Sequence, residues 1–211
     1  MRLTIFGATG GTGTQLAEQA LAAGHEVTAV VRDPARLAIP SHPCLQVVTA
    51  NIMDPASIRP AVTGADAVLT AVGPRSAGPS TVMADSVRSI AAAMDKAGTR
   101  RLLALSGSIA ADGGEGLFLR YLLKPLARRT FLRHVCADMR QAEAEVARTG
   151  LDWTVVRPPQ LTDRPATGKY RTAAERDVPR GFRVSRADLA SYMLLLITDQ
   201  TTVRKHVAIA Y

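Results

Sequence analysis

Near the middle of the chain, Tyr121 and Lys124 lie three residues apart in the run "YLLKP", a candidate pair for acid–base chemistry. A tyrosine whose pKa is lowered by a nearby lysine can protonate the alkoxide that forms when a carbonyl is reduced. On a helix, this spacing would place both side chains on neighbouring surface. Pro125 follows at once, however, and biases Lys124 away from helical geometry. We therefore favour the interpretation that Tyr121 packs and Lys124 is solvated, so that a catalytic acid lies elsewhere or is not needed.

A second chemically informative group is the glycine-rich run "IFGATGGTGTQLAEQAL" at the start of the chain. It joins a predicted strand at 2–6 to a predicted helix at 13–23. Glycines at such a junction permit a tight turn and let the backbone approach a diphosphate at the helix N-terminus. The position of the run favours a dinucleotide site over a simple connecting loop. The predicted cofactor contacts here are Gly7, Thr9, Gly10, Gly11, Thr12 and Gly13.

The second predicted strand ends in "TAVVRDPARL", where the adenosine ribose of a dinucleotide would lie. Arg32 stands where an acidic residue usually accepts the ribose 2′-hydroxyl, and Arg36 follows one helical turn later. A guanidinium matches a 2′-phosphate in a bidentate way, whereas a carboxylate would repel it. This favours NADPH over NADH, although Asp33 could still serve a ribose hydroxyl and Arg36 could simply be solvated.

Three further positions are predicted to contact the cofactor, each following a predicted strand. Asn51 could meet an adenine edge, and Gly73 could let the backbone approach the ribose and nicotinamide. Pro158 ends the sixth strand at the carboxyl edge of the sheet, where ligands bind in folds of this type. Asparagine, glycine and proline are also ordinary loop formers, so that alternative stays open.

Short apolar runs alternate with helical patterns along the chain, which predicts an α/β fold. Strands are expected at 2–6, 26–31, 45–49, 66–71, 101–105, 151–157 and 206–210, and helices at 13–23, 55–63, 80–97, 117–148 (broken) and 186–198. Gly98 is expected to end one helix, and Ser185 with Asp188 to cap another. Continuous apolar strands alternating with helices indicate a doubly wound parallel sheet, a Rossmann fold with helices on both faces.

Composition narrows the class of protein further. The chain of 211 residues is 47% hydrophobic and 21% charged without a change of regime, which predicts one NAD(P)-binding domain over 1–211. Two cysteines and four scattered histidines suggest neither a disulfide framework nor a metal site. The net charge of +8 is spread along a chain with only 4% aromatic residues, which argues against nucleic acid. No apolar run is long enough to span a membrane and no signal peptide is visible, so we expect a cytoplasmic location.

Together, "FGATGGTG", "VVRDPARL", "DAVLTAVG", "STVMADSVRSIAAAM", "TGLDWTVVRPPQLTD" and "TGKY" give the chain a family likeness. It resembles the atypical short-chain dehydrogenases with an NAD(P)H-binding domain, and within them the flavin reductase and biliverdin-IXβ reductase group. The likeness covers nearly the whole chain and is weakest across 107–135. It implies NADPH as hydride donor and a small-molecule acceptor, namely a flavin such as FMN or FAD, a linear tetrapyrrole or a quinone. A homo-oligomer would be compatible with it.

The chain departs from that group at several positions. The group's functional serine near the nicotinamide aligns with Gly107, so the resemblance implies catalytic roles only for the flanking Ser106 and Ser108. Asn51 stands where the group has an acidic residue, and Met139 and Gln160 stand where it has histidines near the substrate. In typical short-chain dehydrogenases the tyrosine and lysine are four residues apart, whereas Tyr121 and Lys124 are three apart.

Two alternatives remain at the level of the sequence. The segment 117–135 is apolar on one side and basic on the other, so it could be a surface helix, a lid over the ligand or a helix on a membrane surface. Glu143 could be a polar pocket residue but is interpreted as a helix-surface residue, and Arg157 as either structural or functional. The protein could also be a catalytically silent dinucleotide sensor similar to the NmrA-like regulators.

Overall fold

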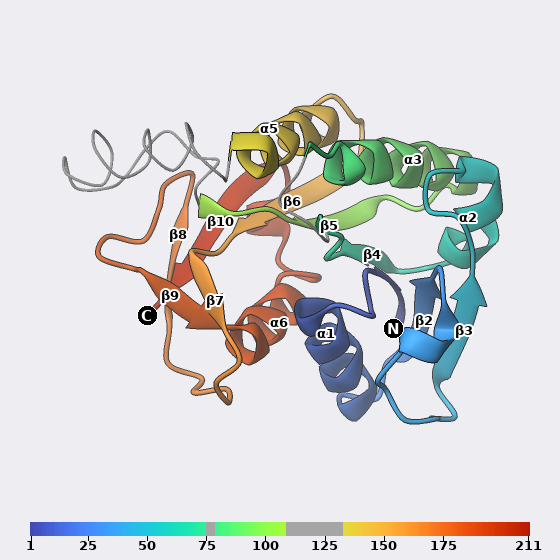
Figure 1. Ribbon diagram of the computed structural model, residues 1–211, viewed down its shortest axis with the longest axis horizontal. Helices are drawn as coiled ribbons and strands as arrows, with labels where there is room; N and C mark the ends of the chain where they lie inside the picture. The colour runs from blue at the N-terminus through green and yellow to red at the C-terminus, as the bar shows by residue number, and fades with distance from the viewer. Residues whose placement is uncertain (75–78, 109–132) are drawn as a thin grey trace.

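The computed structural model describes residues 1–74, 79–108 and 133–211, which form an eight-stranded sheet covered by helices (Figure 1). The strands are β1 (Arg2–Phe6), β2 (Glu26–Val31), β3 (Leu45–Thr49), β4 (Ala67–Thr70), β5 (Arg101–Leu105), β6 (Asp152–Arg157), β7 (Gln160–Thr162), β8 (Arg171–Ala174), β9 (Arg183–Ser185) and β10 (Lys205–Ala210). The helices are α1 (Gly11–Ala22), α2 (Pro55–Val62), α3 (Val82–Ala97), α5 (Arg133–Ala147) and α6 (Arg186–Leu195), with 3-10 turns η1 (Pro34–Arg36) and η4 (Gln200–Thr202).

The strand order of the large sheet is β3-β2-β1-β4-β5-β6-β10-β8. All neighbours pair in parallel except β8, which is antiparallel to β10. The chain winds outward from β1 to β3, then returns to place β4 on the other side of β1. This reversal creates the crevice where doubly wound folds bind their ligands. The predicted fold class and the seven predicted strands are therefore confirmed, with strand ends correct to within a residue.

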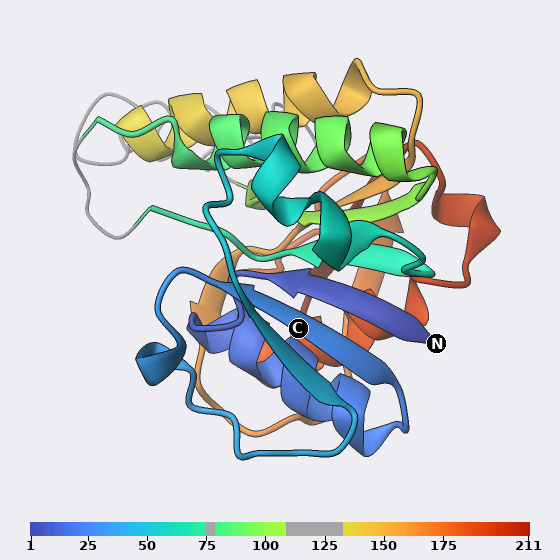
Figure 2. The same ribbon diagram turned by 90° about the vertical axis from the view of Figure 1, so that its right-hand side faces the viewer.

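Helices cover both faces of the sheet (Figure 2), and an apolar cluster lies between the sheet and the helices on each face. Side chains alternate along β1, so that Leu3 and Ile5 face α1 and α6 while Phe6 faces α2, α3 and α5. The apolar residues of α1 and α3 are buried in these clusters, as the helical periodicity of the two segments requires. Burial of both faces explains why the strands read as continuous apolar runs rather than alternating ones.

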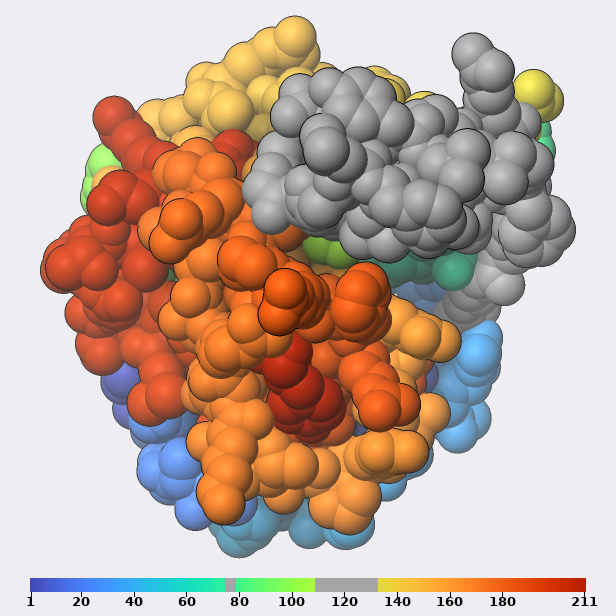
Figure 3. Space-filling model, turned by 90° about the vertical axis from the view of Figure 1, so that its left-hand side faces the viewer, coloured from blue at the N-terminus to red at the C-terminus, as the bar shows by residue number. Residues whose placement is uncertain are grey.

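Three short strands were missed by the sequence analysis. Their sequences, "QLT", "RTAA" and "RVS", are too short and too polar to give an apolar pattern. They form because tertiary neighbours supply the pairing, β10 for β8 and β9 for β7. Figure 3 shows the segment that carries them, in orange, around the dark-red C-terminal residues.

The helix expected at 117–148 is described only in part. Residues 133–147 form α5, and the segment before it, with Tyr121 and Lys124, lies outside the described residues. The alternatives raised for 117–135 thus stay predictions. Of the helices in the described part of the chain, none is long and apolar enough to cross a membrane.

The N-terminus of α3 is capped from another helix. Its own N-cap residue, Thr81, makes no capping hydrogen bond. Instead Asp138 of α5, which is 2% exposed, accepts hydrogen bonds from the backbone N–H groups of Met83 (3.1 Å) and Ala84 (2.9 Å). Because a helix N-terminus favours negative charge and has unsatisfied donors, one carboxylate both caps α3 and fixes α5 against it.

We expect Asp138→Ala to lower the free energy of unfolding by about 2–3 kcal/mol, because two buried N–H groups lose their acceptor. Urea unfolding followed by circular dichroism measures the change. Asp95→Asn, a substitution at an exposed position on the same helix α3, is the control and should change stability by less than about 0.5 kcal/mol. Equal stability of Asp138→Ala and wild type would contradict the assignment.

Candidate dinucleotide-binding site

The predicted glycine loop links β1 to α1 by a backbone path that only glycine can follow. Gly7 has a φ of +83°, and a Cβ there would lie 2.7 Å from the backbone of Ala71. A Cβ on Gly13 would fall inside van der Waals contact with the carbonyl oxygen of Gly7. Helix α1 therefore packs directly against the turn that leaves the strand. This close approach is what the glycine spacing of a dinucleotide-binding loop provides.

The N-terminus of α1 is open to a ligand. Gly10 is its N-cap in an extended conformation, no side chain caps the helix, and no acidic residue lies in the first turn. Gly10 and Gly11 are exposed, Thr9 is half-buried, and Thr12 is 6% exposed. Uncapped N–H groups and the positive end of the helix dipole suit a diphosphate, so the residues present fit a dinucleotide. The individual contacts predicted for this loop stay predictions.

The two arginines after β2 are free to meet a ligand. Arg32 and Arg36 are exposed, and neither has an ion-pair partner among residues 1–74, 79–108 and 133–211. Asp33, the candidate for a ribose hydroxyl, instead caps η1 by accepting the N–H of Ala35 at 3.0 Å. The Asp33 carboxylate is thus used to cap η1, whereas the guanidinium groups of Arg32 and Arg36 form no ion pair with the described residues. This arrangement favours a 2′-phosphate.

The remaining cofactor candidates, Asn51, Gly73 and Pro158, differ in the contacts that they make with the rest of the protein. The side-chain oxygen of Asn51 accepts the N–H of Met53 at 3.1 Å, so part of this amide forms a local turn. A Cβ on Gly73 would meet no atom within 4 Å, so the described neighbours do not require glycine there. Pro158 is buried and its carbonyl accepts the N–H of Ser108 at 2.9 Å, which ties the loop after β5 to the end of β6.

Of the two serines after β5, Ser106 is the one with an unused hydroxyl. It is 7% exposed, its backbone N–H bonds the carbonyl of Val156 at 2.9 Å, and its Oγ has no hydrogen-bond partner in the described part of the chain. It borders a hollow of about 10 Å³ between the sheet and α3 and α5, which is room for about one water molecule. An unsatisfied buried hydroxyl is costly unless a ligand or water meets it. Ser108 has interactions of its own.

A buried ion pair beside that hollow went unrecognised in the sequence. Glu143 of α5 accepts two hydrogen bonds from the guanidinium of Arg157 at the end of β6, at 2.9 and 2.6 Å. Glu143 is only 9% exposed, so its interpretation as a helix-surface residue was wrong. The two residues lie 14 apart on different elements, and no local pattern joins them.

Burial lowers the pKa of nearby His206 and the charge of Arg157 lowers it further, which favours a neutral imidazole.

A second buried carboxylate organises the opposite side of the site. Asp188 in the first turn of α6 is 0% exposed and accepts hydrogen bonds from the Tyr211 hydroxyl (2.6 Å), the Thr167 hydroxyl (2.9 Å) and the N–H groups of Thr167 (3.0 Å) and Gly168 (2.8 Å). Its own N–H bonds Ser185 Oγ, which confirms the predicted capping pair. Asp188 thereby holds the C-terminus, the "TGKY" loop and the start of α6 together.

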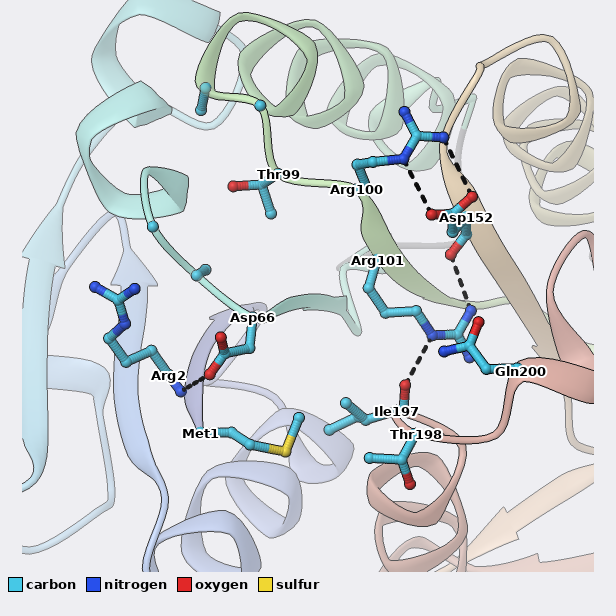
Figure 4. Close-up of a pocket in the computed structure, with 14 residues that line it drawn as sticks. Met1, Arg2, Asp66, Thr99, Arg100, Arg101, Asp152, Ile197, Thr198 and Gln200 are labelled. Atoms are coloured by element: carbon cyan, nitrogen blue, oxygen red, sulfur yellow. Dashed lines mark hydrogen bonds and ion pairs between the residues drawn. The ribbon is translucent and has the colours of Figure 1, made fainter.

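One sizeable hollow lies at the edge of the sheet opposite to the one where a dinucleotide would bind. It has a volume of about 570 Å³ and opens at the amino ends of β1, β4, β5 and β6 (Figure 4). Arg100 pairs there with Asp152 at 3.1 Å, and the buried Arg101 donates to the carbonyl of Ile197 at 3.1 Å. These arginines are engaged in structure, and ligands of doubly wound folds bind at the carboxyl ends of the strands.

The lowered pKa of Asp188 predicts how the stability of the protein changes in acid. Burial alone would raise the pKa of Asp188, but the hydrogen bonds from Tyr211, Thr167 and Gly168 outweigh it and lower the pKa from 3.8 to about 2. Because the folded pKa is depressed, the stabilisation is present above pH 4 and is lost as the pH falls toward 2. We expect about 2 kcal/mol of wild-type stability to disappear over this interval through Asp188.

Urea unfolding of wild type and Asp188→Asn at pH 7, 5, 4 and 3 measures this contribution. The stability difference should be largest at pH 5–7 and shrink at pH 3, whereas the difference for Asp95→Asn should stay near zero. A constant difference for Asp188→Asn at all four pH values would show that the carboxylate charge is not stabilised by the fold.

Comparisons with known proteins agree with this geometry. A family model described as NAD(P)H-binding matches residues 7–200. A protein of Arabidopsis thaliana named as uncharacterized and chloroplastic is 30% identical over 177 residues, which cover 79% of this chain and 61% of that protein. The chain thus spans less than two thirds of that relative.

Two solved structures share the fold over the full chain. A protein from Burkholderia pseudomallei is 27% identical to this chain, with a TM-score of 0.82 and 100% of both chains covered. A short-chain dehydrogenase/reductase from Veillonella parvula in complex with NADP is 19% identical, with a TM-score of 0.83, covering 100% of this chain and 94% of that one; it supports the fold alone. The family model, the fold and the open glycine loop agree, and the chain belongs to the NAD(P)H-binding family.

Proposed function

We propose that the protein is an NADPH-dependent reductase that transfers hydride to a flavin, or to a related conjugated acceptor such as a linear tetrapyrrole or a quinone. NADPH, when bound, would supply the hydride. The match to the NAD(P)H-binding family model supports the cofactor, and the Veillonella parvula dehydrogenase/reductase that holds NADP shares the fold. The residues of this chain support the choice of acceptor.

The choice of acceptor rests on the pKa shifts and hydrogen bonds of the tyrosines that the structure describes. Burial raises the pKa of Tyr170 and of Tyr192 above the usual 10.0, and Tyr211 donates its hydroxyl to Asp188 at 2.6 Å. A tyrosine that protonates an alkoxide works best with a lowered pKa, whereas the pKa values of Tyr170 and Tyr192 are raised and the Tyr211 hydroxyl is bound to Asp188. A flavin accepts hydride at N5 and can take its proton from water, so it needs orientation rather than a side-chain acid.

The protein's own residues would bind and orient the reactants. The first turn of α1 would hold the diphosphate through its N–H groups, and Arg32 and Arg36 would bind the 2′-phosphate. Ser106 Oγ, at the carboxyl end of β5, would donate a hydrogen bond near the nicotinamide, where its hydroxyl now lacks a partner. Positioning of this kind accounts for much of the catalysis of a hydride transfer that needs no acid.

The competing function is a dinucleotide sensor similar to the NmrA-like regulators. One observation favours it: the hollow beside Ser106 admits about one water molecule and is bordered by Glu143, whose carboxylate is fixed by Arg157. A flat acceptor would have to stack outside this hollow.

The cytoplasmic location stays a prediction, since the Arabidopsis thaliana relative is named chloroplastic.

We expect Arg32→Glu to weaken NADPH binding by about ten- to a hundredfold and NADH binding by less than about threefold, because a repelling charge replaces a phosphate clamp. Calorimetric titration with both cofactors measures the two affinities. Arg59→Glu, which makes the same charge change in the last turn of α2, is the matched control and should affect neither. Equal losses for NADPH and NADH in Arg32→Glu would show that Arg32 does not bind the 2′-phosphate.

NADPH consumption with FMN, FAD, biliverdin and a quinone separates reductase from sensor. We expect turnover with at least one acceptor, and we expect Tyr121→Phe to keep FMN reduction within about threefold of wild type, because no side-chain acid is needed. A tyrosine acting as a general acid would instead cost roughly 10²–10⁴ in kcat. NADPH binding without turnover of any acceptor would support the sensor, and a hundredfold loss in Tyr121→Phe would assign the protein to the carbonyl reductases.

A further inference from the structure

An arginine from the C-terminal part of the chain lies across the dinucleotide loop. A Cβ on Gly11, the first residue of α1, would lie 2.8 Å from Cδ and 2.9 Å from Nε of Arg186. The Arg186 side chain therefore rests directly on the first turn of α1. Its guanidinium lies beside the helix end whose N–H groups have no side-chain cap. The chain separates these two residues by most of its length, so the sequence alone does not pair them.

The fold holds the backbone of Arg186 firmly. It is the first residue of α6, between the N-cap Ser185 and Asp188, which are both fully buried and bonded to each other. Helices α1 and α6 lie side by side on one face of the sheet, and Gln19 of α1 donates a hydrogen bond to the carbonyl of Ala187 at 3.0 Å (Figure 1). The position of Arg186 over Gly11 thus follows from the packing of two helices rather than from a mobile side chain alone.

The partner of Arg186 is one that a ligand can replace. Its guanidinium pairs with Asp163 at 2.6 Å, and the side chain of Asp163 is 86% exposed while that of Arg186 is 29% exposed. An ion pair with so exposed a partner contributes little to stability, because water and salt screen it. A diphosphate at the N-terminus of α1 would offer the same guanidinium two charges and fork-matching oxygens.

We propose that Arg186 is a diphosphate-binding residue, which exchanges Asp163 for the diphosphate when NADPH or NADH binds at the N-terminus of α1. The cofactor site is then built from both ends of the chain: glycine backbone from the first turn of α1 and a guanidinium from the first turn of α6. This proposal rests on the binding of NAD(P)H alone and does not depend on which acceptor is reduced.

The test uses binding of nucleotide fragments to the whole protein, measured by calorimetry without any acceptor. ADP carries the diphosphate but no 2′-phosphate, whereas 2′-AMP carries the 2′-phosphate but no diphosphate. We expect Arg186→Gln to weaken ADP, NADH and NADPH alike by about ten- to a hundredfold, and to leave 2′-AMP within about twofold. Arg32→Glu should show the opposite pattern, with 2′-AMP and NADPH weakened and ADP little changed.

Two further variants complete the experiment. Arg164→Gln removes an exposed arginine beside Asp163 and should leave ADP binding within about twofold of wild type, which excludes a general effect of net charge. Asp163→Asn removes the carboxylate that competes for Arg186 and should bind ADP as tightly as wild type or a few-fold more tightly. If it binds ADP tenfold more weakly, the exchange is wrong.

Native circular dichroism and an unchanged Tm are required of each variant. Arg186→Met keeps an unbranched stem over Gly11 and repeats the test if Arg186→Gln unfolds. ADP binding within twofold of wild type in a folded Arg186 variant would overturn the proposal, and so would equal weakening of ADP and 2′-AMP. Loss of acceptor reduction with intact ADP binding would count against the proposed reductase instead.

Discussion

The close approach of α1 to the end of β1 is the constraint on which the rest of the molecule depends. A side chain on Gly13 would collide with the carbonyl of Gly7, and Gly7 itself needs a positive φ to turn the chain beside Ala71 at the end of β4. With both glycines in place, the first turn of α1 points its uncapped N–H groups at the crevice between β1 and β4. The position of this positively polarised helix end beside the crevice follows from the contact.

Buried carboxylates fasten the rest of the chain to that centre. Asp138 caps α3 from α5, and Asp188 gathers the "TGKY" loop, the C-terminal Tyr211 and the start of α6. Each is buried and accepts hydrogen bonds from backbone N–H groups or hydroxyl groups of the described residues. Hydrogen bonds of this kind depend on distance and direction, so they specify geometry as well as add stability. Through Asp188, the C-terminal third of the chain is brought to the cofactor loop.

The far side of the crevice is chemically different. Ser106 offers a hydroxyl without a partner, while Glu143 and Arg157 satisfy each other beside it. In the proposed reaction Ser106 would orient the nicotinamide, and the described residues that line the hollow beside it include no tyrosine or lysine. That difference is the physical basis for preferring an acceptor such as a flavin over a carbonyl compound.

Sequence alone determined the parts of this protein that depend on local pattern. Apolar runs and helical periodicity predicted the seven strands of the parallel sheet, and glycine spacing after the first strand predicted the cofactor loop, because backbone sterics and burial act over a few residues. Ser185 with Asp188 and Gly98 were also predicted, since a cap lies within one turn of its helix. Tertiary structure alone decided the strands β7, β8 and β9, the pair of Glu143 with Arg157, and the contact of Arg186 with Gly11. These join residues on different elements, and the partners become neighbours only when the sheet is assembled and α6 packs against α1.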